Sequence, residues 1–119
     1  MKPWLSLGAL SALLAVAAGA FGAHALGGRI PAERLAIFET GARYHMYHSL
    51  GLIAVGMLAL IRGTNGNGAG ISMSVGIVLF SGSLYALALT GIRALGAVTP
   101  LGGVAFMVGW LLLAGMAWK

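Results

Sequence analysis

Four long apolar runs alternate with short polar stretches along this chain of 119 residues. Each run has about 18 to 23 residues and no Asp, Glu, Lys or Arg, and a helix needs roughly 20 residues to cross a bilayer core of about 30 Å. The stretches after the second and third runs, residues 63–70 and 92–98, are short enough to be simple connections. The pattern therefore predicts four membrane-spanning helices, at residues 4–26, 44–61, 71–91 and 100–118.

The connection between the first two runs, residues 27–43, is longer and has a pattern of its own. In its second half Leu35, Phe38 and Ala42 share one helical face, and the charged side chains lie mostly on the other faces. Such a segment is typical of a helix that lies on the membrane surface. We therefore expect an all-α integral membrane bundle of four transmembrane helices, with a short interfacial helix between the first and second, as a single domain over residues 1–119.

Composition and charge support a membrane protein. The chain is 60% hydrophobic and 8% charged, whereas soluble domains carry roughly 25% charged residues. The formal charge of +5 does not indicate nucleic-acid binding, because the seven basic residues are scattered singly at the ends of the runs. That placement suits lipid headgroups, so membrane lipids are the expected partners. The absence of cysteine excludes disulfides and thiolate chemistry.

The first run carries small residues at a helical spacing. Lipid gives helices no hydrophobic reason to associate, so such a strip matters by letting two backbones approach closely. We expect a packing seam within the bundle, with an intersubunit seam as the alternative, along Ser11, Ala15, Gly19, Ala23 and Gly27. The same run, preceded by Lys2, also resembles a secretory signal peptide, but its apolar stretch exceeds the usual 7–15 residues and favours a retained helix.

The candidate chemistry gathers at one membrane face. A chain that crosses four times brings together the end of the first run, the start of the second, and the link between the third and fourth. Polar groups at membrane depth are costly unless they are paired, so we expect these side chains to bond to one another. Glu39 and Arg43, one turn apart, are an acid and a base in the favourable order. The candidate ligand-binding residues are His24, Glu39, Arg43, Tyr44, His45, Tyr47, His48 and Arg93.

This cluster has several interpretations. The first is that its histidines and tyrosines are interfacial anchors and interhelical hydrogen-bond partners. The second is a site for a lipid headgroup, quinone or similar small amphiphile. The third is a metal site formed by His24, His45, His48 and Glu39, or haem held between His24 and a histidine of the second helix. The histidine spacing matches no recognised metal signature, so we expect neither a metal nor a cofactor.

Enzymatic function is not expected from this sequence, although a metal-dependent enzyme stays open. No serine has a histidine and an acid at a recognisable spacing. The two acids, Glu33 and Glu39, lie outside the runs, so the first helix lacks the buried carboxylate on which small proton-coupled multidrug exporters depend. Ser81, Ser83 and Tyr85, inside the third run, are better explained as interhelical hydrogen-bonding groups.

Four blocks together resemble a known family. They are GAFGAHAL at 19–26, YHMYH at 44–48, LFSGSLY at 79–85 and TPLGG at 99–103. In this order they resemble the bacterial membrane family called domain of unknown function 423, over nearly the whole chain. The resemblance implies a small multi-pass protein of the bacterial plasma (inner) membrane, and it implies no activity. Members of that family can carry Gln at the place of His45, which disfavours a chemistry that needs both histidines of the pair.

We therefore expect an integral membrane protein without catalytic activity. It would be an accessory or scaffold protein, or a binder of a lipid-like small molecule at the polar cluster on one membrane face. A homo-oligomer or a partner membrane protein is compatible with this function. The alternative, from another class, is a histidine-based metal or haem site that supports membrane redox chemistry.

Overall fold

The computed structural model describes residues 3–118, and the regular structure within that range is entirely helical. Four segments of this range are long and apolar enough to cross a membrane, at Pro3–Leu26, Ala32–Arg62, Asn67–Thr90 and Arg93–Trp118. This confirms the predicted all-α membrane protein with four spans. The elements in chain order are α1 (Pro3–Phe21), η1 (Gly22–Leu26), α2 (Ala32–Arg62), α3 (Asn67–Gly76), η2 (Ile77–Ser81), α4 (Gly82–Thr90), η3 (Arg93–Ala97) and α5 (Thr99–Trp118).

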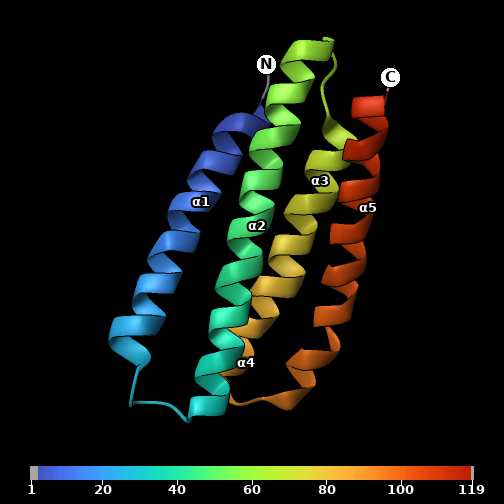
Figure 1. Cartoon of the computed structure of the whole chain (residues 1–119). Coiled ribbons are helices and arrows are strands. Elements are labelled where there is room, and N and C mark those ends of the chain that lie inside the picture. Colours follow the sequence, from blue (N-terminus) through green and yellow to red (C-terminus); the bar gives the residue numbers. More distant parts are fainter. Residues whose placement is uncertain (1–2, 119) are drawn as a thin grey trace.

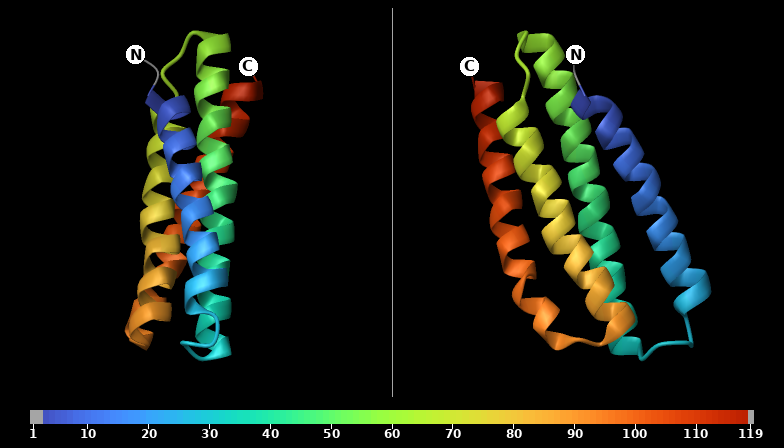
Figure 2. Two further views of the ribbon diagram at one scale, coloured as in Figure 1. Left: turned by 90° about the vertical axis from the view of Figure 1, so that its left-hand side faces the viewer. Right: turned by 180° about the vertical axis from the view of Figure 1, so that it is seen from behind.

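The helices stand side by side in a flattened bundle with α2 in the middle (Figures 1 and 2). The bundle measures 48 × 26 × 19 Å. α1 packs against α2, the continuous α3–η2–α4 helix packs against another side of α2, and α5 packs against α3. The start of α1 and the end of α5 lie at one end of the bundle, and the α1–α2 and α4–α5 connections lie at the other (Figure 1). This is the arrangement that four crossings require.

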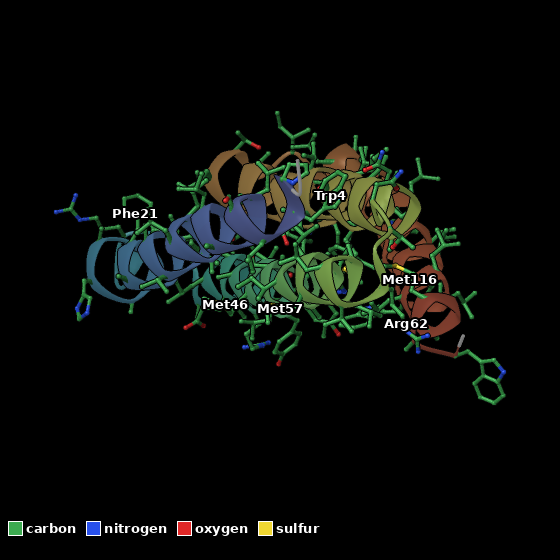
Figure 3. The ribbon with its side chains drawn as sticks, turned by 90° about the horizontal axis from the view of Figure 1, so that it is seen from above. Trp4, Phe21, Met46, Met57, Arg62 and Met116 are labelled. Carbon is green, nitrogen blue, oxygen red and sulfur yellow. The ribbon has the colours of Figure 1, made fainter. Side chains whose placement is uncertain are left out.

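The buried apolar side chains form two small clusters, one toward each end of the bundle. Near the chain ends, Trp4 packs between α1 and α3 (Figure 3), and its indole Nε1 donates to Asn67 Oδ1 at 3.1 Å. At the other end, Leu26, Phe38 and Ala88 join η1, α2 and α4. α2 contributes to both clusters, so it is part of the buried core toward both ends of the bundle.

The predicted interfacial helix is not a separate element, which corrects the sequence analysis. Ala32–Arg62 is one continuous helix, because it holds no proline and its glycines keep helical backbone angles. Phe38 and Ala42 are buried in the bundle, and the Phe38 ring lies 4.8 Å from the ring of Tyr85. The first turns of α2 therefore dock on the bundle, and His45 lies about 20 Å along α2 from its start.

The close approach of α1 to α2 occurs at other glycines than the sequence predicted. A Cβ at Gly8 would lie 2.7 Å from the Ile53 backbone nitrogen, and one at Gly22 would lie 2.9 Å from the Phe38 ring. At Gly19 an added Cβ would meet nothing within 4 Å. The predicted seam is therefore wrong at Gly19, where α1 leaves a space beside α2.

Two arginines near the ends of α2 donate hydrogen bonds to backbone carbonyls near the carboxyl ends of other helices. Arg34 Nε donates to the Ala88 carbonyl of α4 at 2.8 Å, and Arg62 Nη2 donates to the Ala117 carbonyl of α5 at 2.9 Å. The last four carbonyls of a helix have no partner within that helix and carry partial negative charge. Both hydrogen bonds are therefore favourable, and they stabilise the packing of α4 and α5 against α2.

Candidate functional site

His45 is the centre of a polar network that joins three helices. Its Nδ1 lies 2.9 Å from the Tyr85 hydroxyl of α4, and its Nε2 lies 3.1 Å from the Ser11 hydroxyl of α1. The network continues from Ser11 to Ser49 at 2.6 Å, and Ser49 donates to the His45 carbonyl at 2.7 Å. A neutral imidazole has one donor and one acceptor nitrogen, and both positions are engaged here. These hydrogen bonds therefore stabilise the packing of α1, α2 and α4 against one another.

His48, on a nearby face of α2, contacts a different neighbouring helix. Its Nδ1 lies 2.7 Å from the Tyr44 carbonyl, and because a carbonyl only accepts, Nδ1 carries the proton. The imidazole stacks on Phe106 of α5, with ring centroids 3.4 Å apart and planes within 6°. His45 thus points to α1 and α4 while His48 points to α5, so the two histidines do not share one site.

Two of the candidate residues lie outside any cluster, and a third lies at the edge of one. His24 in η1 and Arg93 in η3 are exposed, and within the described residues neither makes a side-chain hydrogen bond, ion pair or ring contact. Tyr47 is half exposed, and its ring lies 5.5 Å from the ring of Tyr44, which in turn lies against the rings of His48 and Phe80. Residues 3–118 also contain no group of three His, Asp or Glu side chains placed to hold a metal ion. The metal site proposed from His24, His45, His48 and Glu39 is therefore not assembled.

Glu39 and Arg43 lie together, although they do not form the ion pair that their spacing predicts. Both side chains are exposed on α2, and the Arg43 Nη2 donates to Thr40 Oγ1 at 3.2 Å while Glu39 has no bonded partner among the described residues. They border an open groove of about 280 Å³ between α1 and α2. The groove is lined by Ala15, Gly19, Glu39, Ala42, Arg43 and Met46.

The hydroxyl groups of the third span are interhelical hydrogen-bonding groups, as the sequence predicted. Ser81 donates to the Gly41 carbonyl of α2 at 2.8 Å, and the Ser83 hydroxyl lies 2.6 Å from that of Thr99 in α5. Tyr85 binds His45. Sequence reasoning missed Ser11 as the partner of His45. The signal was a hydroxyl on the small-residue strip of the first helix, where a polar group needs a partner from a neighbouring helix.

Comparisons with known proteins agree with the membrane architecture. The family model for a protein of unknown function (DUF423) matches residues 18–103. The UPF0382 membrane protein YwdK of Bacillus subtilis is 54% identical over 121 residues, which cover 100% of this chain and 98% of that protein. A UPF0382 membrane protein of Staphylococcus saprophyticus is 52% identical over 113 residues, which cover 95% of this chain and 94% of that protein. No solved structure matches the chain.

Proposed function

The chain belongs to the DUF423 family, whose matched relatives are bacterial membrane proteins, and we propose that it is a non-catalytic binder of a lipid-like molecule in the bacterial plasma membrane. The proposed site is the groove between α1 and α2 that Glu39 and Arg43 border. The proposed ligand is a phospholipid with a zwitterionic headgroup.

One observation carries this proposal: an acid and a base that form no ion pair with each other flank an open groove. Glu39 and Arg43 are one turn apart, yet Arg43 donates to Thr40 and Glu39 has no bonded partner among the described residues, so each is available to a different part of a ligand. A guanidinium recognises a phosphate through several N–H donors, and a carboxylate accepts from an ammonium group. A headgroup with a phosphate and a primary ammonium a few ångströms apart offers both partners.

The remaining lining suits the apolar part of such a ligand. Ala15, Gly19 and Ala42 are small, and Met46 is a flexible apolar side chain that adapts to irregular surfaces. Gly19 has no neighbour within 4 Å of an added Cβ, so an alkyl chain has room beside α1. A site with a few polar groups above an apolar wall is the usual form of a small-molecule site.

The contacts of His45 and His48 inside the bundle support a binding function rather than catalysis. Both ring nitrogens of His45 are bonded within the bundle, and His48 is enclosed by the Tyr44 carbonyl, which its Nδ1 binds, and by the Phe106 ring. These two histidines hold helices together and do not line the groove, so they are not placed to transfer a proton to a ligand bound there.

The test is lipid binding by the purified protein, measured by native mass spectrometry with phosphatidylethanolamine and phosphatidylcholine. We expect tighter binding of phosphatidylethanolamine, because its ammonium donates hydrogen bonds to Glu39 and a quaternary ammonium does not. Gly19→Leu fills the groove and should abolish binding without unfolding the protein. Glu39→Gln should weaken it about tenfold, the loss of one charge-assisted hydrogen bond.

Gly82→Leu is the matched control, because Gly82 in α4 also has nothing within 4 Å of an added Cβ and lies outside the groove. This variant should bind like the parent. Equal binding of the two lipids by the parent, or full binding by a folded Gly19→Leu variant, would refute the proposal.

A further inference from the structure

A second cavity lies at the opposite end of the bundle from the candidate groove. It has a volume of about 580 Å³, within the range of roughly 300–1,000 Å³ typical of ligand sites. The α2–α3 connection and the first turn of α3 form one wall, and the last turns of α5 form the other. Figure 3 shows Arg62 and Met116, two of its lining residues, beside each other at this edge of the bundle.

The polar part of this cavity is cationic. Within the part of the chain that the structure describes, Arg62 is the only charged residue that lines it, and the two acids of the chain, Glu33 and Glu39, lie outside the lining. The Arg62 guanidinium uses one of its five N–H donors on the Ala117 carbonyl and retains the others. Asn67 accepts from Trp4 through Oδ1, which leaves its amide N–H groups as donors. Among residues 3–118 the rim is therefore rich in donors and carries no acidic side chain.

The apolar part of the cavity runs along α5 and is open to the surroundings of the bundle. Leu111 is 73% exposed and Leu112 is 43% exposed, on a helix long and apolar enough to cross a membrane. In a bilayer this surface faces lipid chains, while Arg62 and Asn65 lie at the end of the spans, where headgroups lie. The cavity thus has its donor-rich rim at headgroup depth and its apolar wall at chain depth.

We propose that this cavity binds an anionic membrane lipid, with the phosphate at Arg62 and one acyl chain along Leu111 and Leu112. The site is independent of the α1–α2 groove and differs from it in chemistry. The groove offers an acid and a base to a zwitterion, whereas this cavity offers a base alone. The protein therefore holds a different class of lipid at each end of its spans.

Two substitutions test the site without removing the helix contacts that Arg62 makes. Gly115 lines the cavity, and an added Cβ there would meet nothing within 4 Å, so Gly115→Leu fills space without a clash. Asn65 Oδ1 accepts from the Asn67 backbone N–H at 2.8 Å. Asn65→Asp keeps that acceptor and adds a negative charge to the rim.

The experiment titrates the full chain in detergent with phosphatidylglycerol, phosphatidylcholine and inorganic phosphate, with native mass spectrometry as the readout. We expect phosphatidylglycerol to bind at least about tenfold more tightly than phosphatidylcholine. Gly115→Leu should abolish this binding, and Asn65→Asp should weaken it about tenfold by charge repulsion. Gly19→Leu, which blocks the other groove, should leave phosphatidylglycerol binding unchanged, so the two proposals fail separately.

Three results would overturn the proposal. Binding of inorganic phosphate as tight as that of the lipid would show an anion site without a role for the acyl chain. Unchanged phosphatidylglycerol binding by folded Gly115→Leu and Asn65→Asp variants would place the lipid elsewhere. Equal affinity of the parent for phosphatidylglycerol and phosphatidylcholine would remove the assigned role of the Arg62 charge. Circular dichroism of each variant establishes that it is folded.

Discussion

Replacing two glycines of α1 by alanine should change stability in opposite directions. A Cβ at Gly8 would lie 2.7 Å from the Ile53 backbone nitrogen and 2.9 Å from the Ser49 carbonyl oxygen. Ordinary contacts of a carbon atom are about 3.5–4.0 Å, so α1 and α2 must separate locally by about 1 Å. Backbone atoms cannot rotate away as a flexible side chain can. The Gly8→Ala variant must therefore shift a whole helix.

The cost of that shift follows from the contacts nearby. Overpacking costs about 1–3 kcal/mol. Ser11, one turn further along α1, bonds Ser49 at 2.6 Å and His45 at 3.1 Å, and a shift of about 1 Å breaks both contacts. Each interhelical hydrogen bond in a membrane contributes about 0.6 kcal/mol. Gly8→Ala should therefore destabilise the protein by about 2–4 kcal/mol.

Gly19→Ala is the matched control in the same helix. Its Cβ would meet nothing within 4 Å, so only the higher helix propensity of alanine remains, and the variant should be more stable by about 0.5–1 kcal/mol. The free energy of unfolding is measured for both variants by titration with sodium dodecyl sulfate in mixed micelles, with circular dichroism as the signal. Equal effects of the two substitutions, or a loss at Gly19 greater than that at Gly8, would refute this account of α1–α2 packing.

Three further outcomes follow from the described contacts. Tyr85→Phe should lower the free energy of unfolding by about 0.6 kcal/mol in the same assay. In a double-mutant cycle with Ser11→Ala the two losses should not add, because both hydroxyls bind one imidazole, and additive losses would argue against a shared network. His48→Gln should lower the free energy of unfolding by about 1 kcal/mol, mainly because the ring stack on Phe106 of α5 is lost, and it should remove no metal or visible absorption band. Loss of a stoichiometric metal or of a Soret band in this variant would restore the metal or haem interpretation. Single cysteines at Asn65 and Ala94 should react with an impermeant thiol reagent from opposite sides of the membrane, because the third span, Asn67–Thr90, lies between them. Labelling of both cysteines in intact cells would contradict the four-span arrangement.

The spans were predictable because hydrocarbon imposes a simple rule on sequence. A segment that crosses it must be apolar and long enough, and both properties are visible in the chain itself. The hydroxyls of Ser81, Ser83 and Tyr85 were predictable for the same reason, since a polar group inside a span needs a partner on a neighbouring helix. Each of these predictions follows from the length and composition of a single segment, without knowledge of how the helices are placed.

Features that depend on how the helices are placed were not predictable. His45 and His48 are one turn apart and fall on nearby faces of α2, but α2 is central, so even nearby faces contact different helices. The charged residues before Tyr44 suggested a break that the continuous helix does not have, because burial of Phe38 against α4 holds these turns in the bundle. Gly19 repeats the small-residue spacing of α1, yet it lies where α1 leaves a space beside α2. Spacing along a helix identifies its faces, but not which neighbour covers each face.

The most direct test of the central claim is to map where a photoactivatable phosphatidylethanolamine reacts with the protein in a bilayer. A diazirine in the acyl chain should label peptides that contain Gly19 and Met46, and unlabelled phosphatidylethanolamine should compete with this reaction. Gly19→Leu should remove the label from the groove and leave background labelling of the lipid-facing α5 unchanged. Labelling spread evenly over the lipid-facing helices, or groove labelling that persists in Gly19→Leu, would contradict the claim that the α1–α2 groove holds a zwitterionic lipid.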